Sequence, residues 1–383
     1  SPEQGLRRAR MPEKVLRIGL LGPAPPFRGG ISQFALMLAE EFSREGHETR
    51  MFTFQRQYPK LLFPGGEQTT EFSQMPEIPI EKVFTPYLPG TWKTALDRIN
   101  EFEPDVLVLS YFLPWFAPSY SWISKRLKNV KIVCLAHNID FHEKWPGADI
   151  LTRRLFQNCD RIVLLSRACM DDLRKKMPAS IAEKAVLGFH PIYDFYPRGE
   201  GAESNQNTQQ PTLLFFGLIK PYKGVDVLLD ALKQATMRIP GLKLIIAGAV
   251  YGDQKRYTSQ IRRLGLDSCV ETHFQYVTDA EVAFFFRRSQ VCVLPYKTAT
   301  QSGVIATSYS FDVPVIASNV GGLGEYISEG ITGFLVPPND PEALAGAIIR
   351  YFEDRSYQKM SPHIPSYRAR FSWEKLAGIT LGN

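Results

Sequence analysis

The sequence predicts an α/β fold with two domains, each built around a parallel β-sheet. Short apolar runs alternate with helical patterns along the chain, which is typical of parallel sheets covered by helices. The length of 383 residues exceeds what one hydrophobic core usually holds. A polar stretch at 197–211 has the composition of a linker, and the alternation starts again after it. Two such domains place a ligand cleft between them.

The first domain is expected to span residues 1–196, with 1–14 flexible. An apolar strand at 15–21 is followed by a helix at 32–46, where large apolar residues recur at helical spacing before a glycine stop. Ser166 is placed to cap the helix after the last predicted strand. Further strands are expected at 49–54, 105–109, 131–136 and 161–165.

The second domain is expected to span residues 212–365. A C-terminal helical segment at 366–383, with its helix-like part at 371–379, is expected to cross back to the first domain. A helix is expected at 225–236, and strands at 212–216, 243–247, 270–274, 291–294 and 313–317.

Composition excludes several classes of protein. Hydrophobic residues make up 44% and charged residues 22%, an ordinary globular balance that argues against disorder. The apolar runs are too short to span a bilayer, and no secretory signal is visible, so a cytoplasmic location is expected. The five cysteines are odd in number and their spacings fit neither a disulfide framework nor a zinc site, so they are interpreted as small core residues.

The net charge of +6 is concentrated in the first half of the chain. Residues 1–199 hold 27 basic and 22 acidic side chains, a balance of +5, whereas residues 200–383 hold 18 and 17, a balance of +1. Two interpretations stay open: a solvated surface, or peripheral contact with anionic headgroups on the inner face of the membrane or with an anionic acceptor. No nucleic-acid motif is present, so no nucleic-acid partner is expected.

Two glycine-containing loops follow predicted strands and precede predicted helices. The first ends in Gly29 and Gly30, which let the backbone approach a ligand at a helix start, although they could equally shape a turn. The second, FGLIKPYKG, contains Lys220 and Lys223 beside Gly217, a set that suits a diphosphate at the carboxyl end of a strand. The alternative is a pair of solvated loop lysines.

A third loop, LPYKTATQSGV, contains small polar side chains before a helix, which suit phosphate oxygens or an ordinary N-cap formed by Ser302 or Thr300. A fourth region contains NVGGLGEY and then GITGFLVPPND, which indicates a turn, a short strand and a proline stop.

Together these segments resemble the retaining GT-B glycosyltransferases of family four, also called glycosyl transferases group 1. The family's second domain has a G-R-L-x-P-x-K-G loop, an A-G strand end, a P-S-x-x-E-x-F-G-x-x-x-x-E segment, a P-V-I-A-S strand, a G-G-x-x-E loop and a G-x-x-G-x-L-V-x-P-x-D tail. This chain shows FGLIKPYKG, IIAG, LPYKTATQSGVIATSYS, PVIASNVGGLGE and EGITGFLVPPNDPEAL in the same order, and the resemblance covers about residues 15–380. It implies two Rossmann-like domains facing each other across a cleft.

The resemblance implies roles for particular residues. Gly29 and Gly30 would lie over the donor diphosphate, and His137 would face the transferred sugar, the alternative being a histidine satisfied within the fold. Lys223 matches the family's lysine and would neutralise the leaving diphosphate. The family's arginine falls on Leu218, so Lys220 is expected to supply the missing charge, without the bidentate geometry of arginine.

The third segment departs from the family pattern. The family's two glutamates fall on Thr300 and Ser308, so Thr300 with Gln301 is expected near the donor sugar and Ser308 near the ribose. Backbone donors for the phosphates are expected at Ser302, Gly303 and Val304. The nucleobase, uracil or guanine, is expected near Tyr276 and Val277.

The resemblance implies transfer of a sugar from a UDP- or GDP-linked donor, with retention of anomeric configuration and without metal or cofactor. The acceptor is expected to be a carbohydrate or a lipid-linked, amphipathic glycan, because the aromatic stretches 54–65 and 111–120 could form an apolar groove. Equally, their side chains could pack on the core. The alternatives are a non-catalytic sugar-nucleotide-binding scaffold, a different GT-B reaction such as epimerisation or phosphorolysis, and a periplasmic-type binding protein.

Overall fold

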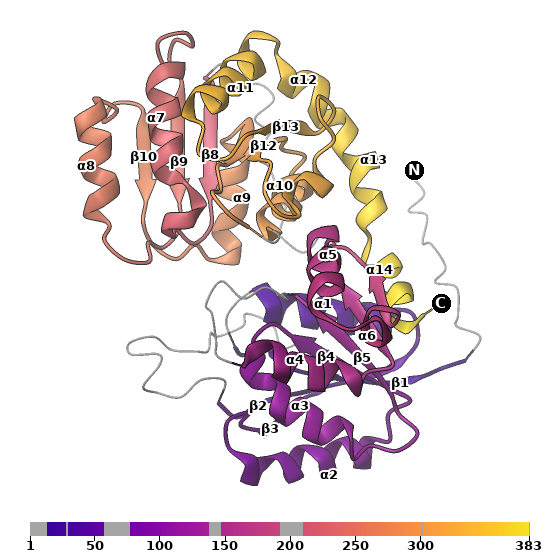
Figure 1. Cartoon of the computed structure of the whole chain (residues 1–383). Coiled ribbons are helices and arrows are strands. Elements are labelled where there is room, and N and C mark those ends of the chain that lie inside the picture. The colour runs from indigo at the N-terminus through magenta and orange to yellow at the C-terminus, as the bar shows by residue number, and fades with distance from the viewer. Residues whose placement is uncertain are drawn as a thin grey trace. The chain divides into compact units, whose positions relative to one another are not determined.

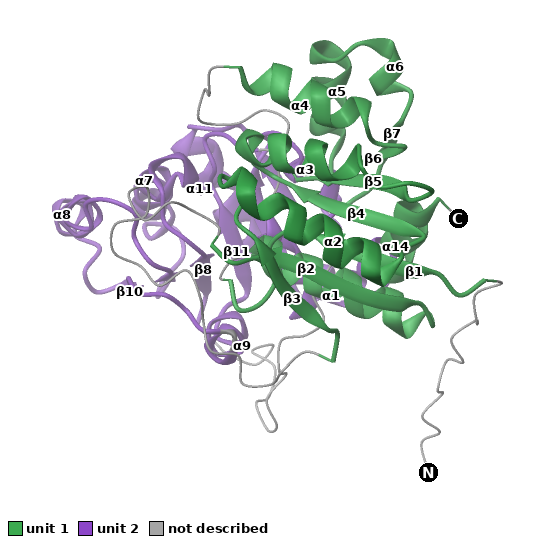
Figure 2. Ribbon diagram, turned by 90° about the horizontal axis from the view of Figure 1, so that it is seen from below, with its two compact units in different colours: residues 1–189, 373–383 green, residues 190–372 purple. Residues whose placement is uncertain are grey.

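The computed structural model describes residues 14–27, 30–56, 77–137, 147–191, 210–299 and 302–382. The chain divides into two compact units, which Figure 2 distinguishes by colour. Unit 1 comprises residues 1–189 with 373–383, and unit 2 comprises residues 190–372. The change of unit at 189/190 precedes the predicted linker, of which only residues 210 and 211 are described.

Unit 1 contains a seven-stranded parallel sheet in the order β3-β2-β1-β4-β5-β6-β7 (Figure 1). The order reverses between β1 and β4, which is the topological switch point of a doubly wound sheet. The strands are β1 (Arg17–Leu21), β2 (Glu48–Phe54), β3 (Ile80–Phe84), β4 (Val106–Tyr111), β5 (Lys131–Ala136), β6 (Arg161–Leu164) and β7 (Ala185–Leu187). The helices are α1 (Gly30–Arg44), α2 (Trp92–Phe102), α3 (Ala117–Ser124), α4 (Ala148–Gln157), α5 (Arg167–Lys176), α6 (Ala179–Ala182) and α14 (Trp373–Leu381).

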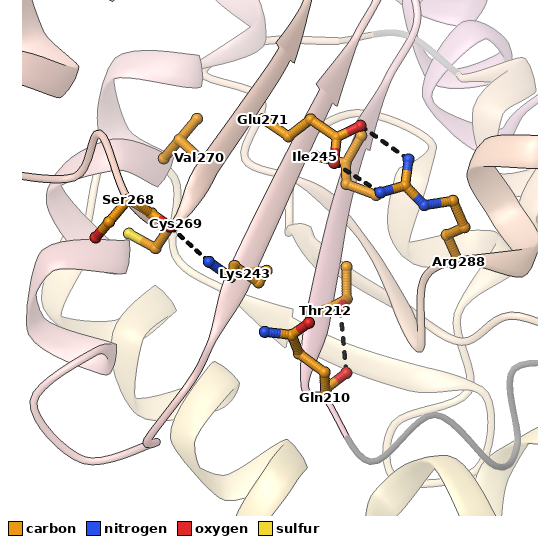
Figure 3. A pocket seen from close by; sticks show the side chains of 9 residues that line it. All are labelled: Gln210, Thr212, Lys243, Ile245, Ser268, Cys269, Val270, Glu271 and Arg288. Carbon is orange, nitrogen blue, oxygen red and sulfur yellow. Dashed lines mark hydrogen bonds and ion pairs between the residues drawn. The ribbon is translucent and has the colours of Figure 1, made fainter.

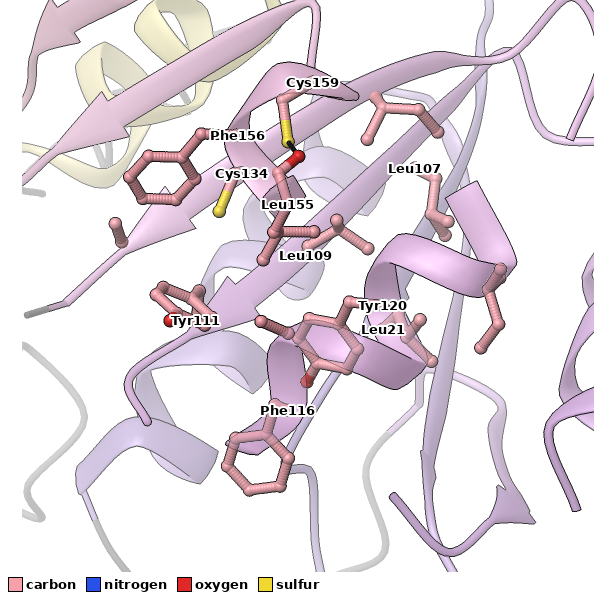
Figure 4. Packing of buried hydrophobic residues seen from close by; sticks show 14 of the residues in the cluster. Leu21, Leu107, Leu109, Tyr111, Phe116, Tyr120, Cys134, Leu155, Phe156 and Cys159 are labelled. Atoms are coloured by element: carbon pink, nitrogen blue, oxygen red, sulfur yellow. Dashed lines mark hydrogen bonds between the residues drawn. The ribbon is translucent and has the colours of Figure 1, made fainter. Parts of the chain in front are cut away.

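A continuous hydrophobic core lies between one face of this sheet and the helices α2 to α4. Alternate residues of β4, such as Leu107 and Leu109, point into this core because successive side chains of a strand face opposite sides (Figure 4). Leu155 and Phe156 from α4 meet them there. Ser166 caps α5 by accepting a hydrogen bond from the amide of Cys169, as the sequence predicts.

The last helix belongs to unit 1 although it follows unit 2 in the sequence. Helix α14 packs on α1, where the rings of Trp373 and Phe34 meet edge to face at 5.1 Å. Lys131 and Arg161, at the starts of β5 and β6, donate hydrogen bonds to carbonyls at the end of α14, at 2.7 Å to Leu381 and 2.9 Å to Ile379. These cations at the helix C-terminus complement its partial negative charge.

Unit 2 contains a six-stranded parallel sheet in the order β10-β9-β8-β11-β12-β13. The strands are β8 (Thr212–Phe216), β9 (Lys243–Ala247), β10 (Val270–His273), β11 (Val291–Leu294), β12 (Val315–Ser318) and β13 (Gly333–Val336). The helices are α7 (Val225–Ala235), α8 (Lys255–Leu264), α9 (Asp279–Arg287), α10 (Gly303–Ser310), α11 (Pro341–Glu353), α12 (Ser356–Met360) and α13 (Ile364–Arg368).

The predicted strands are confirmed with ends that differ by two residues or fewer, and the short strand expected near residue 334 is β13. Two strands were not predicted. The first, β3, has only five residues, with two charged side chains next to each other, and the second, β7, has only three residues. All five cysteines are free, and all but the half-buried Cys269 are buried, as expected for small core residues. None of the described helices is long and apolar enough to cross a membrane.

Candidate functional site

Three loops of unit 2 pack together at the carboxyl ends of its strands. After β8, Gly217 adopts φ of 102° and a short 3₁₀ turn at Pro221–Lys223 leads to Gly224, which has φ of 70° and precedes α7. Positive φ is strained for residues with a Cβ atom, so glycine suits both positions. The amide of Ile219 donates to Ala249 at 2.8 Å, which joins this loop to the one after β9.

Close backbone contacts fix how these loops pack. A Cβ atom on Gly224 would lie 1.9 Å from the carbonyl oxygen of Pro295, in the loop after β11. A Cβ atom on Gly248, after β9, would lie 2.0 Å from the carbonyl oxygen of Gly217. In addition, the amide of Lys297 donates to the carbonyl of Tyr222 at 2.7 Å. The three loops therefore form one packed surface, as expected for a ligand site at the end of a parallel sheet.

Lys223 projects into this junction. Its ammonium nitrogen lies 5.1 Å from the ring centroid of Tyr296 and 3.8 Å from the position that a Cβ atom of Gly217 would occupy. Burial by itself lowers the pKa of Lys223, but the neighbouring Tyr296 and Tyr222 outweigh it and raise the pKa above its ordinary value. The ammonium is therefore charged throughout the physiological pH range.

Lys220 lies in the same loop but in a different environment. Its ammonium nitrogen lies 5.0 Å from the ring centroid of Tyr251, which follows β9 and is 69% exposed. A cation over an exposed aromatic ring is held weakly. The two lysines that the sequence analysis singled out thus share one loop, with Lys223 packed between loops and Lys220 near the surface.

The start of α10 lies beside Lys223, since the side chain of Val304 is within 3.4 Å of the position for a Gly217 Cβ atom. Ser302 caps this helix, as one of the sequence alternatives predicted, and accepts from the amide of Val304 at 3.3 Å. Gly303 is the first residue of the helix. Thr300 and Gln301 lie outside the described residues.

Tyr276 and Val277, the residues predicted to lie near the nucleobase, follow β10 and precede α9. Tyr276 is 57% exposed, and Val277 is half-buried. Next to them, Thr278 and Glu281 form a capping box at the start of α9, with the Glu281 carboxylate accepting from the Thr278 amide at 2.8 Å. This cap orders the chain directly after the two predicted residues.

In unit 1, His137 directly follows β5. Its amide donates to the carbonyl of Tyr111 at 2.8 Å, and its ring packs edge to face on Phe34 of α1 at 4.9 Å. His137 is 2% exposed, so packing of α1 on the sheet already accounts for its position. Gly30 is the first residue of α1, and Gly29 lies outside the described residues.

An ion-pair network that the sequence analysis did not identify supports the lysine loop. The carboxylate of Asp226, in the first turn of α7, accepts from the Lys297 ammonium at 2.7 Å and from Arg256 at 3.0 Å. Gln260 donates to the Asp226 carbonyl at 2.9 Å. An acidic residue in the first turn of a predicted helix is a local pattern that could have drawn attention to Asp226. Its partners Lys297 and Arg256, however, are 71 and 30 residues away in the sequence.

The two halves of the chain match two glycosyltransferase family models. Residues 28–184 match the model described as Glycosyltransferase Family 4, and residues 210–354 match the model described as Glycosyl transferases group 1. The chain belongs to glycosyltransferase family 4. It is 24% identical over 412 residues to a D-inositol 3-phosphate glycosyltransferase of Saccharomonospora viridis, covering 98% of this chain and 95% of that protein.

Further relatives support this family assignment. An uncharacterized glycosyltransferase of Methanocaldococcus jannaschii is 30% identical over 219 residues, covering 57% of each chain. Among solved structures, Anabaena HepE in complex with UDP has a TM-score of 0.76 at 17% identity, covering 96% of this chain and 99% of that one. This similarity confirms the GT-B fold, with two α/β domains, for the present glycosyltransferase.

One expected donor contact of this glycosyltransferase, that of Ser308, needs correction. Ser308, predicted near the ribose, is fully buried and donates to the carbonyl of Val313 at 2.8 Å, so its hydroxyl is committed within the core. The serine side chain is shorter than the glutamate that the family has at this position, and here it stays inside the core. Leu218, at the family's arginine position, is 45% exposed and supplies no charge.

The aromatic stretch 111–120 of the glycosyltransferase does not form the expected acceptor groove. Tyr111, Phe116 and Tyr120 are fully buried, Phe112 is 7% exposed and Trp115 is half-buried, so the alternative of core packing is correct here (Figure 4). Tyr111 Oη pairs with Thr152 at 2.7 Å, which satisfies its hydroxyl inside the core. In the other stretch, 54–65, Phe54 is fully buried and residues 57–65 lie outside the described residues.

A cavity of 270 Å³ in unit 2 lies at the opposite end of the sheet, where β8, β9 and β10 begin (Figure 3). Its charged groups are already paired: Arg288 donates to both oxygens of Glu271 at 2.8 and 2.7 Å, and Lys243 donates to the carbonyl of Ser268. The hydrogen bonds from Arg288 lower the pKa of Glu271 to about 2. The cavity therefore lacks an unpaired charge for a diphosphate and is distinct from the loop surface.

Proposed function

We propose that this family 4 glycosyltransferase transfers a sugar from a UDP-sugar to a carbohydrate acceptor, with retention of configuration and without a metal ion. The observation that carries the proposal is Lys223, a half-buried cation at the carboxyl end of β8 beside the start of α10. Anabaena HepE, a protein of similar fold, was solved in complex with UDP, which supports uracil over guanine as the base of the donor.

The chemistry follows from the charge that moves during transfer. Departure of the nucleoside diphosphate leaves positive character on the sugar and negative charge on the phosphate oxygens. A cation and backbone N–H groups already in place at those oxygens lower the barrier, because they need no reorganisation during the reaction. We assign to Lys223 the main positive charge at the phosphates and to Lys220 a second one nearer the surface. At Gly217, Gly303 and Val304 the backbone is proposed to approach the phosphates closely.

His137, Gly29 and Gly30 are proposed contacts of the donor, and Tyr276 with Val277 proposed contacts of the uracil. Thr300, Gln301 and Ser302 remain proposed contacts of the sugar and phosphates. Ser308 is not included, because its hydroxyl is bonded within the core.

The acceptor is proposed to be a carbohydrate or a lipid-linked glycan. The relative from Saccharomonospora viridis is named for an inositol phosphate acceptor, a polyol with an anionic group. The excess of five positive charges in residues 1–199 is complementary to such a group. Flotation with vesicles that contain anionic lipid tests whether the acceptor is a lipid-linked glycan in a membrane. Turnover of soluble acceptors only, without binding to vesicles, would reject the lipid-linked acceptor.

The first experiment is calorimetric titration with UDP and GDP in the presence of EDTA, on wild type and on Lys223→Ala. We expect UDP to bind, and Lys223→Ala to weaken it by about 10- to 100-fold, since a charge-assisted contact to phosphate is removed. The matched control is Lys243→Ala, a lysine at the opposite end of the sheet. Binding of neither nucleotide would contradict the proposed donor site. Nucleotide binding without transfer or hydrolysis would favour the alternative of a non-catalytic sugar-nucleotide-binding scaffold, which the uncharged Leu218 and the buried Ser308 also favour.

Hydrolysis or transfer from UDP-sugars, followed by NMR of the product's anomeric proton, tests catalysis and retention. An inverted product would contradict the proposed mechanism while leaving the donor site intact. Activity that is lost in EDTA and restored by a divalent cation would contradict metal independence.

A further inference from the structure

Tyr296 occupies a position between the lysine loop and the start of α10. It follows β11, and its side chain is only 2% exposed. The preceding residue, Pro295, makes the backbone contact with Gly224, and the following residue, Lys297, pairs with Asp226. The backbone on both sides of Tyr296 is therefore held, which limits the positions that its hydroxyl can adopt.

The Tyr296 hydroxyl connects to α10 through Ser302. The two hydroxyl oxygens are 3.2 Å apart, and the Ser302 oxygen also accepts from the Val304 amide at 3.3 Å. A serine oxygen has two lone pairs, so it can accept from the tyrosine and from the helix amide together. Tyr296 thereby bonds to the residue that caps α10.

On its other side Tyr296 meets Lys223. The ammonium nitrogen is 5.1 Å from the ring centroid, and Tyr296 raises the pKa of Lys223. An ammonium group beside an aromatic ring is attracted to it, so the ring of Tyr296 contacts Lys223 while its hydroxyl bonds to Ser302. Tyr296 thus links the two: its ring contacts Lys223, its hydroxyl pairs with Ser302, and Ser302 accepts from the Val304 amide.

We propose that Tyr296 is a positioning residue that holds the Lys223 ammonium and the start of α10 at the separation that a bound diphosphate requires. This inference rests on the proposed function and deepens it. With leucine in place of the family's arginine at position 218, Lys220 and Lys223 are the basic side chains of the lysine loop. A fixed lysine costs less side-chain entropy on binding than a mobile one, and Tyr296 supplies that restraint.

The test is UDP titration of Tyr296→Phe, which keeps the ring over Lys223 and removes only the hydroxyl. We expect about tenfold weaker UDP binding, the size of one lost hydrogen bond, because the hydroxyl no longer bonds to Ser302. The matched control is Tyr309→Phe in α10, whose buried hydroxyl donates to Tyr326 at 2.9 Å. Tyr309→Phe removes an equally buried phenol in the same unit, and we expect UDP affinity to remain within about twofold of wild type.

A double-mutant cycle separates positioning from general stability. In a Lys223→Met background, Tyr296→Phe is expected to change UDP affinity by less than about twofold, because the Lys223 ammonium is absent. An equal loss in both backgrounds would overturn the proposal, as would wild-type affinity in Tyr296→Phe alone.

Chemical labelling gives a readout that needs no nucleotide. Acetylation of Lys223 by an N-hydroxysuccinimide ester, followed by mass spectrometry, is expected to be several-fold faster in Tyr296→Phe than in wild type or Tyr309→Phe, because only the neutral amine reacts and Tyr296 raises the pKa of Lys223. If wild type binds neither UDP nor GDP, the proposed function fails, and the labelling rate still decides whether Tyr296 holds Lys223. Equal rates in the three proteins would refute that restraint.

Discussion

The backbone of Gly224 touches the backbone of Pro295 so closely that a Cβ atom on Gly224 would lie 1.9 Å from the Pro295 carbonyl oxygen. Gly224 separates the lysine loop from α7, and Pro295 precedes Tyr296 in the loop after β11. The two loops that we assign to the donor diphosphate are thus in direct main-chain contact. Any side chain at position 224 has to separate them.

We therefore predict that Gly224→Ala weakens UDP binding by at least tenfold and lowers the unfolding temperature. The control is Gly241→Ala, because Gly241 has φ of 73°, close to the 70° of Gly224, but no atom within 4 Å of its would-be Cβ. Gly241→Ala carries only the strain of positive φ, about 1 kcal/mol, and should leave UDP affinity unchanged. Calorimetry and thermal melting of both variants separate the clash from the strain. Identical behaviour of the two variants would show that the loop contact is unimportant.

Asp226→Asn is predicted to weaken both stability and donor binding. The substitution leaves the half-buried Lys297 ammonium without its carboxylate partner at 2.7 Å, and the loop containing Tyr296 loses that restraint. Because Asp226 is 21% exposed, we expect a modest loss of about 1 kcal/mol in unfolding free energy. Asp230→Asn, one turn later on α7 and bonded to Gln260, is the control. UDP affinity that falls equally in both variants would argue against a specific role for the pair.

His137→Gln is predicted to lower kcat about 100- to 1,000-fold without changing UDP affinity. The reason is that the proposed contact of His137 is to the transferred sugar, which UDP lacks, and loss of one such donor raises the barrier by that order. His273→Gln in unit 2, where His273 pairs with Glu271 near the cavity, serves as control. Unchanged kcat would assign His137 to packing on Phe34 alone, whereas weaker UDP binding would indicate a disturbed fold.

Stability is predicted to fall as pH rises from about 5 to 8, through Glu45 at the end of α1. Burial, together with the carboxylates of Glu41 and Glu374, raises the pKa of Glu45 to about 7, while Arg44 opposes the shift. A folded-state pKa above the unfolded value means that the stabilising contribution is full below about 4.5 and lost as pH rises through 7. Since Glu45 is partly exposed, solvent screening limits the effect to about 1 kcal/mol.

Urea unfolding of Glu45→Gln at pH 5 and pH 8 measures this contribution. The variant should be more stable than wild type at pH 8 and nearly equal to it at pH 5, because glutamine mimics the protonated side chain. Glu183→Gln, at an exposed position after α6, should show no such difference. A pH-independent effect of Glu45→Gln would contradict the assignment. Glu45 lies near Glu374 of α14, which packs on α1. Ionisation of Glu45 is therefore expected to loosen the contact between α1 and α14.

The two α/β domains followed directly from local patterns. Apolar runs such as 131–136 and 243–247 became strands at those same bounds, because buried parallel strands are continuous apolar segments whose ends the flanking polar residues mark. The order of the motifs also predicted the family, and the lysine loop was found because glycines and lysines after a strand are a local signal.

Other features depended on residues that are distant in the sequence. Asp226 and Lys297 are 71 positions apart, Gly224 and Pro295 also come from different loops, and no local pattern reports such a meeting. Ser308 and the aromatic residues of 111–120 were predicted to contact ligands because of their residue types. Their exposure, however, depends on which face of a helix or strand packs against the core. Periodicity shows that an element has an apolar face, whereas packing decides whether a polar hydroxyl on it reaches solvent or, as with Ser308, bonds to a carbonyl inside.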